Sequence, residues 1–143
     1  MGKSRYIALS FTRKTPMHFA PVIPLLESDP RIIAVYALGS AVRDELRPDS
    51  DIDLALLLTP GASLAAGELI ALAAKFTEML ERPVDLGLLS ALNLVYLRQA
   101  VLVGQCIYRR PFSPAALMVA NGLGLYAHFH DERREVLNAY TTG

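Results

Sequence analysis

Hydrophobic and polar positions change their spacing several times along the chain, and these changes divide it into short strands and longer helices. Short apolar runs rich in β-branched residues predict strands at residues 31–38, 51–58, 83–89 and 104–109. Apolar residues at helical spacing and local capping signals predict helices at 19–26, 40–46, 63–81, 91–103 and 113–140, with Gly122 and Gly124 as weak points of the last. Strands that alternate with helices predict an α/β fold, an α+β two-layer sandwich.

Length and composition indicate one globular domain. The 143 residues are 52% hydrophobic and 20% charged, which is enough for a core and too apolar for a disordered chain. We therefore predict a single domain over 1–143, with a core at about 19–110 and a C-terminal helix at about 113–140.

Charge and cysteine usage exclude several classes of protein. With 14 basic and 14 acidic residues the net charge is zero, so we expect neither direct nucleic-acid binding nor binding to a membrane surface. The longest uncharged run, 111–130, is interrupted by proline, asparagine and glycine, so no membrane span is expected. Cys106 has no second cysteine to pair with, which favours the cytoplasm.

An acidic cluster stands out against this neutral background, because five of the fourteen acids lie within residues 44–53. Asp51 and Asp53 fall on one face of a predicted strand, with Cα atoms about 6.6 Å apart. Two such carboxylates without a basic partner repel each other, and a divalent cation such as Mg²⁺ relieves the repulsion. An Asp-x-Asp pair alone is more often a solvated strand edge, so its surroundings decide the interpretation.

Those surroundings suit phosphate and metal. Gly39 lets the chain approach a ligand closely, Ser40 opens the next helix with its anion-binding N–H groups, and Arg43 adds a positive charge one turn later. The Gly-Ser pair taken alone is equally an ordinary helix cap. Asp85 is a third candidate, because a lone acid between apolar strand residues is costly unless it is paired or bound to metal.

The run GSAVRDELRPDSDIDL, residues 39–54, closely resembles the signature of the minimal nucleotidyltransferases of the DNA polymerase beta superfamily. That signature is Gly-Ser, ten residues, then Asp-x-Asp, and Asp85 falls where the family keeps its third carboxylate. Asp44 departs from the pattern, since relatives often have glycine there, which leaves its effect on activity open. The resemblance covers roughly residues 31–110 and implies the minimal nucleotidyltransferase fold, a small mixed sheet with packed helices and a C-terminal helix.

A narrower resemblance concerns residues 126–137, YAHFHDERREVL, which are similar to the terminal helix of antitoxins from HEPN–MNT toxin–antitoxin systems. It implies transfer of AMP from Mg·ATP to a tyrosine hydroxyl of a partner HEPN toxin, an RNase that the modification neutralises. Gly39, Ser40 and Arg43 would then hold ATP. Asp51, Asp53 and Asp85 would be catalytic and would coordinate two Mg²⁺ ions, with Asp85 also orienting or deprotonating the hydroxyl.

Two other functions fit the sequence. About 33 residues follow Arg110, too few for a separate acceptor-binding domain, so we expect the acceptor to come from another chain. The chain could instead be a non-catalytic binding antitoxin, or a small-molecule nucleotidyltransferase of the aminoglycoside type. Nucleotide preference, the number of AMP units, the acceptor residue and oligomerisation within a complex stay open.

Overall fold

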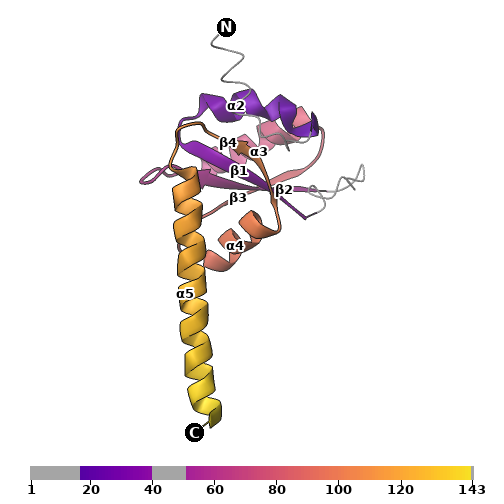
Figure 1. The fold of residues 1–143 in the computed structure, drawn as a ribbon. Helices are drawn as coiled ribbons and strands as arrows, with labels where there is room; N and C mark the ends of the chain where they lie inside the picture. The colour runs from indigo at the N-terminus through magenta and orange to yellow at the C-terminus, as the bar shows by residue number, and fades with distance from the viewer. Residues whose placement is uncertain (1–16, 40–50, 143) are drawn as a thin grey trace.

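A mixed four-stranded sheet forms the centre of the computed structural model, in which residues 17–39 and 51–142 are described (Figure 1). Its strands are β1 (Ile32–Leu38), β2 (Ile52–Leu58), β3 (Val84–Leu88) and β4 (Gln105–Arg109), in the order β3-β2-β1-β4. β1 pairs antiparallel with both β2 and β4, whereas β2 and β3 are parallel. The parallel pair is joined through a helix, as parallel neighbours require.

The helices are η1 (Met17–Val22), α2 (Ile23–Ser28), α3 (Ala66–Leu80), α4 (Leu94–Leu102) and α5 (Ala115–Thr142). The single helix predicted at 19–26 is divided into the 3₁₀ helix η1 and α2. Pro24 stands in the first turn of α2, where a missing N–H is tolerated, so the α-helix begins just before it. The helix predicted at 40–46 lies outside the described residues.

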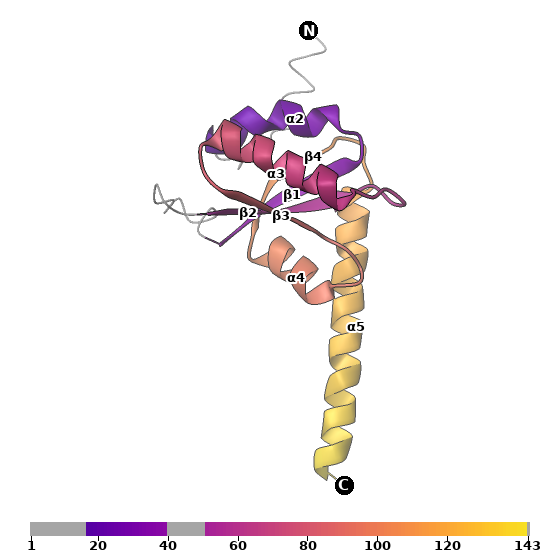
Figure 2. The same ribbon diagram turned by 180° about the vertical axis from the view of Figure 1, so that it is seen from behind.

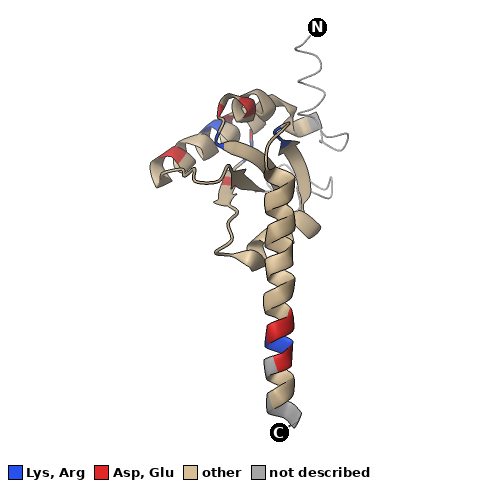
Figure 3. Ribbon diagram, turned by 60° about the vertical axis from the view of Figure 1, so that its left-hand side comes forward, with Lys and Arg blue, Asp and Glu red and all other residues tan. Residues whose placement is uncertain are grey.

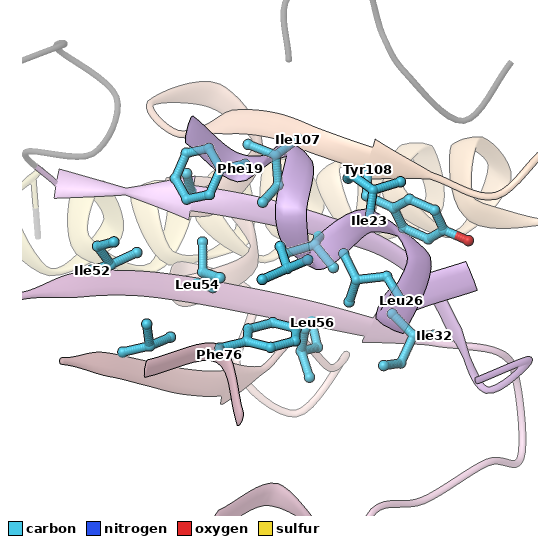
Figure 4. Close-up of a cluster of buried hydrophobic side chains, with 14 residues drawn as sticks. Phe19, Ile23, Leu26, Ile32, Ile52, Leu54, Leu56, Phe76, Ile107 and Tyr108 are labelled. Atoms are coloured by element: carbon cyan, nitrogen blue, oxygen red, sulfur yellow. The ribbon is translucent and has the colours of Figure 1, made fainter. Parts of the chain in front are cut away.

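Both faces of the sheet are covered by helices (Figure 2). On one face, η1, α2 and α3 bury Phe19, Ile23 and Phe76 against the strands, as the close-up in Figure 4 shows for most of this cluster. On the other, α4 and the beginning of α5 bury Leu97 and Ala115. The α/β class predicted from the sequence is confirmed, and the second helical face adds to the two layers that were expected.

Strand β2 contributes side chains to the hydrophobic clusters on both faces of the sheet and to the surface. Ile52, Leu54 and Leu56 alternate into the α2–α3 side, as their spacing predicts. Ala55 and Leu57 are buried on the opposite side, under α4 and α5. Asp53 shares that second face but is exposed, because it lies near the start of the strand, at the edge of the helical cover.

Helix α5 is continuous over 28 residues, so the weak points expected at its two glycines do not break it. A Cβ at Gly122 would lie 2.6 Å from a methyl carbon of Leu97, so glycine at this position allows α4 and α5 to pack closely. Beyond this contact the helix extends away from the sheet (Figure 1). None of the described helices combines the length and the hydropathy that crossing a bilayer requires.

Candidate active site

Two carboxylates meet on neighbouring parallel strands. Asp53 in β2 and Asp85 in β3 are partners in the strand register, and both side chains are exposed. Adjacent strands are about 4.8 Å apart, and partners in register present their side chains on the same face of the sheet. The structure therefore brings together two of the three carboxylates that the sequence singled out.

Gly39 lies beside this pair. It follows β1 directly, and its neighbour Leu38 is the register partner of Asp53. The backbone at Gly39 has a positive φ of 63°, which favours glycine, and a Cβ there would lie 3.9 Å from Oδ2 of Asp53. The end of β1 thus approaches the carboxylates with its backbone, the arrangement that the sequence suggested for ligand binding.

These groups open into a pocket of about 410 Å³ on the face that carries Asp53 and Asp85. Its polar and glycine lining consists of Gly39, Asp53, Asp85, Gly87, Tyr96 and Gln99. Sequence reasoning did not find the last three. Tyr96 and Gln99 belong to α4, which packs on β1 and β4, and only the tertiary structure reveals that they reach the pocket.

The surroundings of Asp53 in the pocket disfavour the ionised form of its carboxyl group. Burial raises the pKa of the Asp53 carboxyl, and the nearby charges of Asp85 and Asp51 raise it further. Within residues 17–39 and 51–142, no basic side chain forms an ion pair with any of these three acids. The described part of the site thus presents carboxylate oxygens without a basic ion-pair partner, a donor set to which a divalent cation is suited.

The third predicted carboxylate, Asp51, is not part of the register pair of Asp53 and Asp85. Asp51 precedes the first residue of β2 and is exposed, near enough to influence the pKa of Asp53. Among the described residues, no three acidic, histidine or cysteine side chains gather tightly enough to form a metal-binding group. The geometry thus presents a pair, Asp53 and Asp85, with Asp51 adjacent to it.

The remaining predicted ligands cannot be placed. Ser40 and Arg43, expected to contact the nucleotide, lie outside the described residues, as does the unusual Asp44. Their assignments stay predictions that rest on the sequence.

Comparison with known families finds a match over the region that contains the pocket. Residues 21–112, more than half of the chain, match the family described as "Polymerase beta, Nucleotidyltransferase". The matched region contains all four strands and both carboxylates of the pair. A search of curated proteins finds no match.

Similar folds occur in solved toxin–antitoxin structures. A chain in the crystal structure of a toxin–antitoxin with AMP-PNP is 25% identical, with a TM-score of 0.65 over 85% of this chain and 96% of that one. A chain of a mutant MntA–HpeT toxin–antitoxin is 26% identical, with a TM-score of 0.64 over 84% and 94%. A structure of a tri-AMPylated Shewanella oneidensis HEPN toxin in complex with MNT antitoxin contains a chain similar in fold, at 24% identity and a TM-score of 0.63 over 87% and 97%.

Proposed function

The chain belongs to the polymerase beta nucleotidyltransferase family and is a nucleotidyltransferase, and from this premise we propose that it is an antitoxin that transfers AMP from Mg·ATP to a tyrosine hydroxyl of a partner HEPN toxin. The observation that carries the proposal is the register of Asp53 and Asp85 at the mouth of a pocket bordered by Gly39. Similarity to a chain crystallised in a toxin–antitoxin with AMP-PNP supports an adenine nucleotide as substrate and a toxin as partner.

The residues fit a divalent metal. Asp53 and Asp85 provide adjacent carboxylate oxygens; burial raises the pKa of Asp53 and the charges of Asp85 and Asp51 raise it further, and a bound cation would relieve this repulsion. In the proposal Asp51, Asp53 and Asp85 together hold two Mg²⁺ ions. When bound, the metal neutralises charge on the triphosphate and orients it for in-line displacement.

The reaction is a phosphoryl-group substitution. The acceptor oxygen forms a bond to the α-phosphorus of ATP, and the bond from that phosphorus to the oxygen bridging to the β-phosphate breaks. Pyrophosphate carries away the bonding electrons, and the Asp85 carboxylate takes the proton of the acceptor hydroxyl. The contribution of this chain is mostly positioning and charge placement, since such transfers need little covalent help from the protein.

The triphosphate is assigned to the β1 side of the pocket. Gly39 exposes backbone there beside Asp53, and Ser40 and Arg43 follow in the chain. Backbone N–H groups at the start of the helix predicted at 40–46 would favour anions, and Arg43 would add a charge-assisted contact.

We assign the surface that binds the partner toxin to α5. Charged residues of both signs gather beyond its middle, at 131–135, while residues 115–130 carry no Lys, Arg, Asp or Glu (Figure 3). In that uncharged part Leu125 and Phe129 are 42% and 54% exposed, past the region that packs on the sheet. An apolar helix face with a charged end suits recognition by a helical protein, and a HEPN toxin is the partner we propose.

The test is co-expression with the product of the neighbouring gene, followed by purification and intact-mass measurement of that product after incubation with Mg·ATP. We expect wild-type protein to add the mass of AMP and Asp53→Asn to add none. Glu78→Gln, which removes an exposed carboxylate from α3 on the opposite face, is the matched control and should retain transfer.

The other outcomes separate the alternatives. A stable complex without any mass increase would support a binding antitoxin and refute AMP transfer. A neighbour without the Arg-x4-His sequence of HEPN RNases, together with labelling of aminoglycosides from labelled ATP, would support a small-molecule enzyme. Transfer by Asp53→Asn at the wild-type rate would refute the metal assignment.

A further inference from the structure

Tyr96 is held firmly at the wall of the pocket. It lies in the first turn of α4, where its backbone N–H donates to the side chain of the N-cap residue Asn93 over 3.2 Å. The next residue, Leu97, and Ala100 one turn later are buried under the sheet, which fixes the rotation of the helix. Tyr96 therefore reaches the pocket from a rigid element.

The phenol ring lies directly over Gly87 of β3. A Cβ at Gly87 would collide with the hydroxyl oxygen of Tyr96 and would lie 3.1 Å from its Cζ. The ring occupies the space that a side chain at position 87 would fill. Because Gly87 follows Asp85 by two residues, it shares the face of the strand that carries this carboxylate.

The pocket consequently has two sides. The strand order places β1 on one side of Asp53 and β3 on the other. Gly39, the proposed triphosphate contact, lies at the end of β1, whereas the ring of Tyr96 lies over Gly87 of β3, two residues along that strand from Asp85. A group at Tyr96 thus lies over the strand that carries Asp85, the carboxylate assigned to the acceptor hydroxyl, and this strand is separated by β2 from the β1 end that carries Gly39.

Resting on the proposed function, we propose that Tyr96 binds the acceptor: its hydroxyl hydrogen-bonds the incoming hydroxyl-bearing group and aligns it beside Asp85. Gln99, one helical turn further along α4, is a second polar residue that lines the pocket. A flat ring with neutral polar groups suits an aromatic hydroxyl, the chemistry of a tyrosine side chain, because rings pack edge-to-face or in offset stacks.

The protonation of Tyr96 agrees with this role. Burial raises the pKa of its hydroxyl, and the charge of Asp53 raises it further. The hydroxyl of Tyr96 therefore stays protonated and can donate a hydrogen bond at neutral pH. The charged groups that line the pocket, the carboxylates of Asp53 and Asp85, can only accept hydrogen bonds when they are ionised.

The test compares Tyr96→Phe with Tyr108→Phe, using the toxin co-purified in the co-expression experiment as acceptor. Tyr108 offers the same chemical change far from the pocket, in the opposite core, where its buried hydroxyl has no hydrogen-bond partner among the described residues. We expect Tyr96→Phe to raise the KM for the toxin about 5-fold, the worth of one neutral hydrogen bond, with the Kd for Mg·AMP-PNP by calorimetry unchanged. Tyr108→Phe should change neither value.

Gly87→Ala keeps the hydroxyl but displaces it, so it should also raise the KM for the toxin. The double variant Gly87→Ala/Tyr96→Phe should be no worse than Gly87→Ala, because the atom that collides has been removed.

A weaker Kd for Mg·AMP-PNP in Tyr96→Phe, with the KM for the toxin unchanged, would overturn the inference by placing Tyr96 on the nucleotide side. Unchanged values for both would overturn it as well. If the wild-type protein transfers no AMP, the proposed function itself fails, and this outcome is recognised before any variant is compared.

Discussion

Removing the charge of Asp53 should stabilise the folded protein while it abolishes activity. The side chain faces Asp85 across the strand register, and its pKa is raised by burial first and by its acidic neighbours next. A carboxyl group whose pKa is higher in the folded state destabilises that state when ionised. Asp53→Asn keeps the shape and removes the charge, so the free energy of unfolding should increase.

The size of the effect follows from the spacing of the strands. Two unit charges about 5 Å apart repel by about 0.8 kcal/mol in water and by about 3 kcal/mol at an effective dielectric constant near 20. Both carboxylates are exposed to solvent, which screens the repulsion and favours the lower value. We expect a gain of about 1 kcal/mol, or roughly 3 °C in Tm for a chain of this length.

The assay is thermal unfolding followed by circular dichroism, in chelator and at low salt, for wild type, Asp53→Asn, Asp85→Asn and the double variant. The second substitution should add little to the first, because the repulsion has already been removed. The pH dependence has a definite sign. The advantage of Asp53→Asn should be full above the folded pKa of Asp53 and should disappear as the pH falls through 3.8, where the group is protonated in the unfolded chain too.

Mg²⁺ provides the second part of this test. Wild type should gain Tm on addition of Mg²⁺, and Asp53→Asn should gain much less, since binding to the folded state alone stabilises it. A lower Tm for Asp53→Asn in chelator would refute the reasoning, because it would mean that the carboxylate has a stabilising partner.

Three predictions concern the scaffold. Phe76→Ala should lower the free energy of unfolding by about 3–5 kcal/mol in urea titrations, whereas Leu92→Ala, at a side chain 98% exposed, should change it by less than about 0.5 kcal/mol. Arg110→Met should cost about 2–3 kcal/mol in the same assay, because its guanidinium donates to four backbone carbonyls at the end of α2 and the start of β1; an unchanged midpoint would contradict this. A side-chain hydrogen bond from Arg31 lowers the pKa of Asp29, so the Tm deficit of Asp29→Asn should be largest at neutral pH and shrink as the pH falls below about 4; a deficit independent of pH would refute the pairing.

The sequence alone was enough to predict those site residues whose role follows from the chemistry of their own strand or turn. Asp53 was found from the sequence because it shares one face of a predicted strand with Asp51, Asp85 because a lone carboxylate between apolar strand residues is costly without a function, and Gly39 because it ends a strand before a helix-capping serine. Tyr96 could not be found in this way, since a tyrosine in an amphipathic helix is usually part of a core. Its role depends on the absence of a side chain at Gly87, a residue in a different strand.

The alternation of apolar residues was enough to determine the strands, most of the helices and the α/β class, because each element must bury a face whose period is set by its own backbone geometry. Only the tertiary structure decided that β2 and β3 are parallel neighbours in the register that joins Asp53 to Asp85, since pairing depends on contacts between segments about thirty residues apart. The place of Gly122 was likewise decided by the tertiary structure. The sequence marks this glycine as a weak point of a helix, but it is the position where α5 meets Leu97 of α4, and the absence of a side chain there lets the two helices pack closely.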